Sequence, residues 1–282
     1  MRLLRFGPPG EVRPAGIDPD GVLRDLSSVI GDVDGALLGD PTSLALARRA
    51  LEAYDLPRVP DDAQLAPPLA RPGKIVGIGL NYRDYAAQVG AAIPERPVVF
   101  LKASSSLSGP HDAIELPEGS AATDYEVELG VVMGGTLRRC TDHTEALAAV
   151  GGYVAANDVT ERGLASDGPT WAKGKCSDTF TPVGPWLVTP DEVPDPQALA
   201  LELRVNGGVR QQGSTEDMAF GVAEILCYLS SLMTLEPGDL VLTGTPGGVA
   251  ATRPEPKPFL RDGDVVELQV AGLGRQRTCV RA

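Results

Sequence analysis

The segment Asp124-Tyr125-Glu126-Val127-Glu128-Leu129-Gly130-Val131-Val132 places two carboxylates two residues apart in a stretch that otherwise has the composition of a buried strand. Side chains at positions i and i+2 of an extended chain point to the same side. Glu126 and Glu128 therefore share one face of the predicted strand. Two interpretations remain open: a half-exposed strand with an acidic outer face, or a pair of oxygen ligands for a hard cation, because adjacent carboxylates repel each other unless a cation or a proton offsets their charge.

Composition limits the classes of protein to which the chain can belong. Its 282 residues can form one large domain or a large domain with a small partner, and 43% apolar and 22% charged residues are ordinary for a globular protein. The net charge of -13 argues against nucleic acid or an anionic membrane surface as the main partner. A small anionic substrate stays possible, because a local cation can override the overall charge. No apolar run approaches the roughly 18 residues that span a bilayer.

Cysteine and histidine exclude several kinds of site. The four cysteines are widely spaced and form no Cys-x-x-Cys motif, which disfavours zinc-ribbon and disulfide-framework folds. Reduced thiols, and a start at Met1 without an apolar signal-peptide core, lead us to expect a cytoplasmic protein. His111 and His143 are the only histidines and lie near turn and helix-start signals, so a histidine-rich metal site or a Ser-His-Asp triad is disfavoured.

The pattern along the chain predicts an α+β fold dominated by strands. Residues 1–70 contain short strand-like pieces, a helical run and a Pro-rich linker, and we expect a small N-terminal α+β domain there. Residues 71–282 begin with a buried strand at Lys74–Leu80 and contain further strands, two of which we expect to pair in a C-terminal hairpin. The clearest helix is Phe220–Met233, with an apolar face made of Val222, Ile225, Leu226, Leu229, Leu232 and Met233.

Several weak motifs follow one another in an order that resembles the fumarylacetoacetate hydrolase family. They are Asn81-Tyr82, the Glu126-x-Glu128 strand, Asp158 at the end of a strand, Gly174-Lys175 in a polar loop and Leu242-Thr243-Gly244-Thr245-Pro246. The resemblance runs from about Lys74 to the end, and the preceding residues look like the small domain of bacterial members. It implies the β-dominated mixed-sheet roll of the family's C-terminal domain and a homodimer.

The resemblance also implies a metal centre. Glu126, Glu128 and Asp158 match the family's three carboxylate ligands to Mg²⁺ or Mn²⁺. Hard oxygen ligands that leave open positions suit a divalent ion that binds a 2-oxo acid. Lys175 matches the active-site lysine that helps to hold developing negative charge. The two positions that match residues gripping the substrate carboxylate are Arg162 and Thr245.

The departures from the family pattern concern acid–base chemistry. Hydrolytic and decarboxylating members carry a His on a mobile helix with a Glu three residues later; this chain has Tyr85 and Gln88 at those positions. Neither is a general base at neutral pH, since tyrosine has a pKa near ~10 and glutamine does not titrate. The family's Arg-Asp and the Gln beyond it are replaced here by Gly163 and Ala165.

These features lead to one expected function and one alternative. We expect a divalent-metal-dependent enzyme that acts on a small anionic 2-oxo acid or 1,3-dicarbonyl compound, with the family's C–C bond hydrolysis or decarboxylation shifted to enolate chemistry such as decarboxylation, tautomerisation, hydration or cyclisation. Tyr85 is then a candidate proton donor, although it can equally be a packing residue. The alternative is a catalytically inactive homologue that binds a metabolite or acts as a scaffold.

Overall fold

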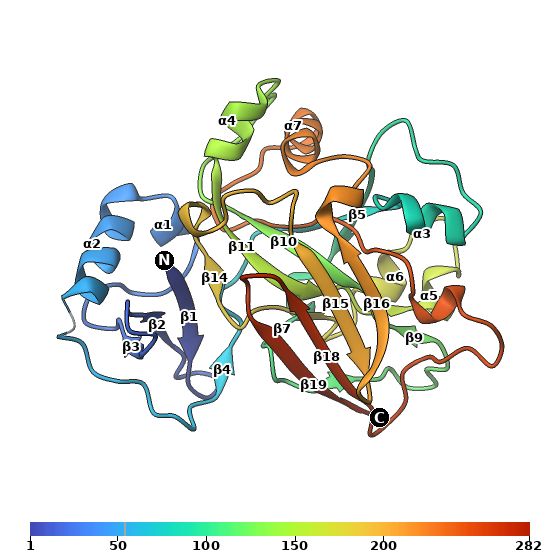
Figure 1. Ribbon diagram of the computed structural model, residues 1–282, viewed down its shortest axis with the longest axis horizontal. Coiled ribbons are helices and arrows are strands. Elements are labelled where there is room, and N and C mark those ends of the chain that lie inside the picture. The colour runs from blue at the N-terminus through green and yellow to red at the C-terminus, as the bar shows by residue number, and fades with distance from the viewer. Residues whose placement is uncertain (54) are drawn as a thin grey trace.

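A mixed 10-stranded sheet runs through the computed structural model, which describes residues 1–53 and 55–282 (Figure 1). The strand order is β3-β2-β1-β14-β11-β10-β17-β5-β6, with β4 paired to β1. Only β17 and β5 pair in parallel among these neighbours in the described residues. The bounds are β1 Arg2–Phe6, β2 Arg13–Ile17, β3 Leu23–Asp25, β4 Leu65–Ala66, β5 Ile75–Gly79, β6 Val98–Lys102, β10 Val127–Met133, β11 Val150–Asn157, β14 Leu187–Val188 and β17 Leu240–Leu242.

A second, 5-stranded sheet packs against the middle of the first. Its order is β16-β15-β18-β19-β8, and β15 and β18 contact β10 while β18 also contacts β11. The expected C-terminal hairpin is confirmed as β18 and β19. Two sheets with apolar side chains packed between them confirm the predicted strand-dominated α+β fold. The bounds are β8 Ile114–Glu115, β15 Ala200–Val205, β16 Gly208–Ser214, β18 Val265–Val270 and β19 Arg275–Arg281.

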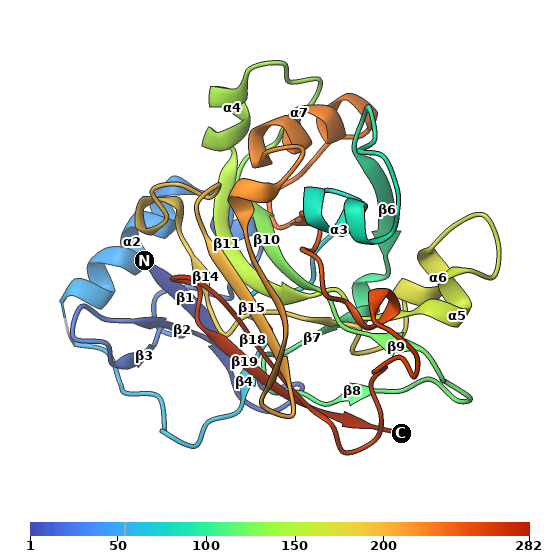
Figure 2. The same ribbon diagram turned by 45° about the vertical axis from the view of Figure 1, so that its right-hand side comes forward.

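Short helices and strand pairs close the ends of the sheets. The helices α4 and α7 lie together at one end, and α5 and α6 lie side by side near β9 (Figure 2). In α7 the predicted apolar face is largely confirmed, but Leu232 in its last turn is 55% exposed. The helices are α1 Gly35–Leu38, α2 Pro41–Glu52, α3 Arg83–Gln88, α4 His143–Ala148, α5 Arg162–Ala165, α6 Ala172–Lys175 and α7 Val222–Leu232, with 3₁₀ turns η1 Ser104–Ser106, η2 Pro190–Glu192, η3 Thr215–Asp217 and η4 Ala250–Thr252; the short strands are β7 Leu107–Ser108, β9 Thr123–Asp124, β12 Thr160–Glu161 and β13 Thr181–Pro182.

Both faces of β10 are buried. Val127, Leu129 and Val131 belong to the core between the two sheets, whereas Val132 packs in a second core on the opposite face. Glu128 alternates with the first set and so lies on the same side as Val132. It is 1% exposed, and Glu126 just before the strand is 5% exposed. The interpretation of a half-exposed strand with an acidic outer face is therefore wrong.

The N-terminal strands extend the central sheet. β1 pairs with β14, so residues from the start of the chain share hydrogen bonds with the segment around Leu187. A separate apolar cluster beneath α2 includes Leu3, Leu26 and Leu51. The division into residues 1–70 and 71–282 stays a prediction. A segment that spans a bilayer as a helix must be long and apolar, and the described residues form no such helix.

Asn81 fastens the loop after β5 to two distant segments. Its side-chain amide donates to the carbonyl of Phe220 at 3.1 Å and to that of Thr243 at 2.8 Å, and its side-chain oxygen accepts from the Phe220 N–H at 2.8 Å. The side chain is fully buried. These bonds join the start of α7 and the end of β17 to the loop that leads into α3.

We expect the Asn81→Ala variant to lose about 3 kcal/mol of unfolding free energy, because it strands one buried N–H and two carbonyls without partners. Urea unfolding measures the loss. Gln212→Ala, on an exposed strand position, is the control and should stay within about 0.5 kcal/mol of the parent. Equal stability of the two variants would show that Asn81 does not hold these segments together.

Candidate functional site

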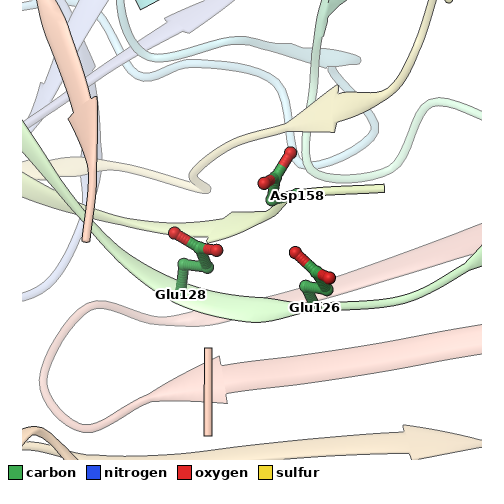
Figure 3. Close-up of side chains that lie close together, drawn as sticks. All are labelled: Glu126, Glu128 and Asp158. Atoms are coloured by element: carbon green, nitrogen blue, oxygen red, sulfur yellow. The ribbon is translucent and has the colours of Figure 1, made fainter. Parts of the chain in front are cut away.

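Three carboxylates from two neighbouring strands converge at the edge of the second core. Glu126 lies just before β10, Glu128 lies within it, and Asp158 follows directly after β11. The Asp158 N–H donates to the Glu126 carbonyl at 2.9 Å, so the two residues lie opposite each other across the ladder. One carboxylate oxygen from each of the three lies within 4.8 Å of the others (Figure 3). The predicted convergence of these three side chains is confirmed.

Two buried lysines face this cluster. Lys175 Nζ donates to Glu126 Oε2 at 2.7 Å and to Asp158 Oδ2 at 2.5 Å. Lys102, at the end of β6, donates to Asp158 Oδ1 at 2.5 Å. Burial alone lowers the pKa of Lys175, but Asp158 and Glu126 outweigh it and raise that pKa above its ordinary value. The same lysines hold the pKa of Asp158 below its ordinary value despite its burial.

Lys175 lies in a short helix and not in the polar loop expected from the sequence. It is the last residue of α6, which packs closely on α5. A Cβ on Gly174 would lie 2.4 Å from the Glu161 carbonyl oxygen, so the preceding position requires glycine. The Gly174-Lys175 motif thus combines a close backbone approach with the placement of an ammonium group.

Arg162 is paired with carboxylates inside the chain. Its Nε donates to Asp124 Oδ2 at 2.9 Å, and its Nη2 donates to Glu126 Oε1 at 2.6 Å. Burial acts to lower its pKa, but Glu126 and Asp124 raise it overall, so the guanidinium stays charged. Asp124 also accepts the N–H groups of Ala250 and Ala251 at the start of η4. Nη2 also lies 2.9 Å from Asp124 Oδ2, so the two N–H groups of Nη1 remain for the substrate carboxylate that the resemblance assigns to Arg162.

Glu128 differs from the other acids of the cluster. It accepts a hydrogen bond from the Gly244 N–H at 2.7 Å, and no basic side chain in the described residues 1–53 and 55–282 forms an ion pair with it. Burial, followed by repulsion from Asp158 and Glu126, raises the pKa of Glu128 well above its ordinary value.

The charges of the cluster suit an added cation. Four carboxylates (Asp124, Glu126, Glu128 and Asp158) face three basic groups (Lys102, Arg162 and Lys175). The excess is a buried negative charge, which costs free energy unless a proton or a cation offsets it. Three converging carboxylates of this kind are a donor set that fits Mg²⁺ or Mn²⁺.

A cavity of about 380 Å³ opens beside the cluster. It is large enough for a small carboxylic acid. Charged and apolar side chains both contribute to its wall. The lining residues are Ile78, Gly79, Leu80, Tyr85, Phe100, Glu126, Glu128, Thr160, Arg162, Ala165, Ser166, Trp171, Lys175 and Thr245.

The hydroxyl of Thr245 is used within the fold. It donates to the Val127 carbonyl at 2.9 Å and accepts from the Gln211 side-chain amide at 2.7 Å. Because a hydroxyl has one proton, it cannot also donate to a bound carboxylate. Of the two groups of Thr245 that could contact a bound carboxylate, its hydroxyl and its backbone N–H, only the backbone N–H remains a candidate donor.

Tyr85 and Gln88 take different parts in α3. Tyr85 lines the cavity, and burial together with the nearby Glu126 raises the pKa of its phenol. The Gln88 side-chain oxygen instead accepts from the Gly248 N–H at 2.9 Å and the Thr252 hydroxyl at 3.1 Å. Asp84 accepts from the Gly247 N–H, so both residues fasten α3 to the glycine loop. The phenol is thus held at the cavity in its protonated form.

Three buried residues of this network were not among the site residues predicted from the sequence. Lys102 ends an apolar strand, Asp124 begins the acidic segment, and Gln211 lies in an alternating strand. Asp124 carried a detectable signal, since it lies two residues before Glu126 on the same face. The partners of Lys102 and Gln211 are 56 and 34 residues away, so local spacing gave no signal for either.

We expect Glu128→Gln to weaken Mn²⁺ binding by at least about 100-fold. Substitution of a residue that only hydrogen-bonds to a metal ligand already lowers metal affinity by up to about that factor, and the loss of a ligand should cost more. The amide oxygen of the new glutamine can still accept from the Gly244 N–H, and the substitution removes the excess negative charge. The protein should therefore remain folded. Calorimetric titration measures the affinity. Glu118→Gln, at an exposed carboxylate, is the control. Parental affinity in Glu128→Gln would refute the ligand assignment.

We expect Lys102→Met to lower the unfolding free energy by about 3–5 kcal/mol, because Asp158 loses a fully buried partner. Saturating Mn²⁺ should restore part of this loss, since ligand binding stabilises the folded state. Denaturant unfolding with and without metal measures both effects. Lys173→Met, which breaks the exposed pair with Asp167, should cost less than about 1 kcal/mol.

Comparison with known proteins identifies the family. Residues 74–281 match the model of the fumarylacetoacetate (FAA) hydrolase C-terminal domain. A fumarylacetoacetate hydrolase from Exiguobacterium antarcticum is 34% identical, with a TM-score of 0.87 over 100% of this chain and 99% of that one. A 2-hydroxyhepta-2,4-diene-1,7-dioate isomerase from Mycobacterium marinum is 32% identical, with a TM-score of 0.79 over 100% and 98%.

A third structure was solved with ligands. It is the maleylpyruvate hydrolase from Sphingobium sp. SYK-6 in complex with manganese(II) and pyruvate, which is 30% identical to this chain, with a TM-score of 0.81 over 100% of this chain and 99% of that one. The family model covers well over half of the sequence, and the folds agree over its full length. The chain belongs to the fumarylacetoacetate hydrolase family.

Proposed function

We propose that this protein is a divalent-metal-dependent enzyme that acts on a small 2-oxo or β-dicarbonyl carboxylate through an enolate. The observation that carries the proposal is the convergence of Glu126, Glu128 and Asp158 beside a cavity that also contains Lys175 and Tyr85. The relatives named above include hydrolases and an isomerase, and one of them binds manganese(II) and pyruvate. Those activities support a 2-oxo carboxylate as the substrate class.

The three carboxylates would hold Mg²⁺ or Mn²⁺, which when bound acts as a Lewis acid toward the substrate's carbonyl oxygen. Arg162 contributes the remaining N–H donors of its guanidinium group to the substrate carboxylate. Asp124 positions the guanidinium group, because its carboxylate accepts from Arg162 Nε and also from an N–H group at the start of η4.

Lys175 stabilises the negative charge of the enolate. Its ammonium is buried and stays protonated because Asp158 and Glu126 raise its pKa. In a buried site an ammonium group interacts with developing charge more strongly than it does in water. The Phe100 ring, whose centroid lies 4.9 Å from Nζ, shields one side of this group from solvent.

Tyr85 supplies the proton in this proposal. Burial and Glu126 raise the pKa of its phenol, so it is a donor at neutral pH. In decarboxylation the C–C bond to the leaving carboxylate breaks, CO₂ departs and an enolate remains; in enol-to-keto tautomerisation the enol O–H releases its proton to solvent. Transfer of the phenolic proton to the enolate carbon completes either reaction, and the phenolate regains a proton from solvent. Gln88 cannot activate water in place of a carboxylate, and its side chain is bonded to Gly248 and Thr252. The protonated phenol of Tyr85 and the bonded amide of Gln88 favour enolate chemistry over hydrolysis by a His/Glu pair on this helix.

We expect Tyr85→Phe to lower kcat by about 100-fold while Mn²⁺ affinity stays unchanged, because only the transferable proton is lost. The assay is a panel of acylpyruvates, oxaloacetate and fumarylpyruvate with Mg²⁺ or Mn²⁺. Nuclear magnetic resonance in D₂O must accompany it to measure proton exchange, since tautomerisation gives no product of new mass. Tyr228→Phe, remote from the cavity, is the matched control.

Two results would contradict the proposal. If Tyr85→Phe retains full kcat, the phenol is a packing residue. If 2-oxo acids bind with metal but undergo neither turnover nor proton exchange, the protein is the inactive metabolite-binding homologue considered as the alternative. A homodimer and a cytoplasmic location remain expectations from the family and the composition.

A further inference from the structure

The cavity wall combines a charged cluster with an apolar surface. Among the residues that line it in the described parts of the chain, only Arg162 and Lys175 are basic, and both are paired with carboxylates. The remaining wall is mostly apolar and is formed by Ile78, Leu80, Phe100, Ala165 and Trp171. Below we call these five residues the apolar wall.

The aromatic part of the apolar wall begins at the charged cluster and leads away from it. Lys175 Nζ lies 4.9 Å from the centroid of the Phe100 ring. The Trp171 ring meets Phe100 edge-on, with centroids 5.8 Å apart, and is 37% exposed. A ligand held at Lys175 can therefore extend along Phe100 toward Trp171 and the mouth of the cavity.

Two glycines of β5 leave the space that the Phe100 and Trp171 rings occupy. A Cβ on Gly77 would lie 2.1 Å from the Phe100 ring, and one on Gly79 would lie 2.3 Å from the Trp171 ring. Both rings therefore rest on bare strand backbone, as glycine within a strand permits. The spacing of the two glycines places both on the same face of β5. The aromatic part of the apolar wall thus lies where β5, β6 and the residue before α6 meet.

We propose that this cavity selects a 2-oxo acid with a single carboxylate and an uncharged, apolar tail, and discriminates against 2-oxo diacids. The inference rests on the function proposed above. One carboxylate is held at Arg162. A second carboxylate would lose its hydration and lie against a wall that offers no basic partner, which costs free energy. An apolar tail instead gains free energy with each methylene that it buries on Phe100 and Trp171.

The test compares ligands matched in carbon number. Calorimetry on the Mn²⁺-loaded protein measures the binding of pyruvate, 2-oxopentanoate and 2-oxohexanoate, and of the diacids 2-oxoglutarate and 2-oxoadipate. We expect affinity to rise about 3-fold for each methylene from pyruvate to 2-oxohexanoate. Each diacid should bind at least roughly 30-fold more weakly than the monoacid with the same number of carbons.

A pair of variants tests the role of the wall itself. Trp171→Arg places a cation on it and should raise the affinity for 2-oxoglutarate relative to 2-oxopentanoate by about 10-fold. Trp171→Leu keeps the wall apolar and should preserve the preference for the monoacid. The exposed position of Trp171 makes both substitutions compatible with folding.

The outcomes separate the two proposals. If pyruvate binds and 2-oxoglutarate binds as tightly as 2-oxopentanoate, tail selectivity is overturned while the proposed function stands. An unchanged ligand preference in Trp171→Arg also overturns the role of the wall. If pyruvate itself does not bind in the presence of Mn²⁺, the proposed function fails, and this inference fails with it.

Discussion

The buried ion cluster around Asp158 is the interaction on which the site depends. Asp158 is fully buried and accepts from Lys102 and Lys175, which come from β6 and α6. Its N–H is bonded to the Glu126 carbonyl, so the same residue also fixes the register between β10 and β11. Removing one partner of a buried pair leaves an uncompensated charge, and this penalty holds three separate segments in place.

The excess of negative charge gives the cluster its chemical character. If Glu128 had a basic partner of its own, the acids and bases would balance and the cluster would be a structural ion network. Instead, within residues 1–53 and 55–282, the Glu128 carboxylate has only the Gly244 N–H as a partner, and its burial beside Asp158 and Glu126 raises its pKa. A divalent cation bound by these carboxylates would relieve this repulsion.

The acid–base groups around the cavity form a second unit. Asp84 and Gln88 bond to the glycine loop, and this fixes α3 so that Tyr85 lines the cavity. Gln88, at the position where the resemblance implies a carboxylate, therefore has a positioning role here. Where the resemblance implies a water-activating pair, the structure has a phenol that lines the cavity and an amide that is bonded to the glycine loop.

Local pattern predicted the acidic residues better than the basic ones. Glu126, Glu128 and Asp158 stand out because carboxylates are unusual at the ends of buried strands, and the parity of an extended chain places the two glutamates on one face. Lys102 has no such signal, because a lysine after a strand is most often solvated. The environment that buries it comes from Asp158 and from the carbonyls of Val159 and Phe180.

The sequence by itself determined the strand-dominated fold through the periodicity of neighbouring residues, and the family and the three acids through the order of motifs along the chain. The tertiary structure alone decided which charges meet, that the Thr245 hydroxyl is taken up by Val127, and that Gln88 fastens a loop. It also decided the apolar wall, since Gly77 and Gly79 acquire their role only when Phe100 and Trp171 lie against them. Contacts between distant segments depend on how the sheets pack, and local sequence carries no record of that packing.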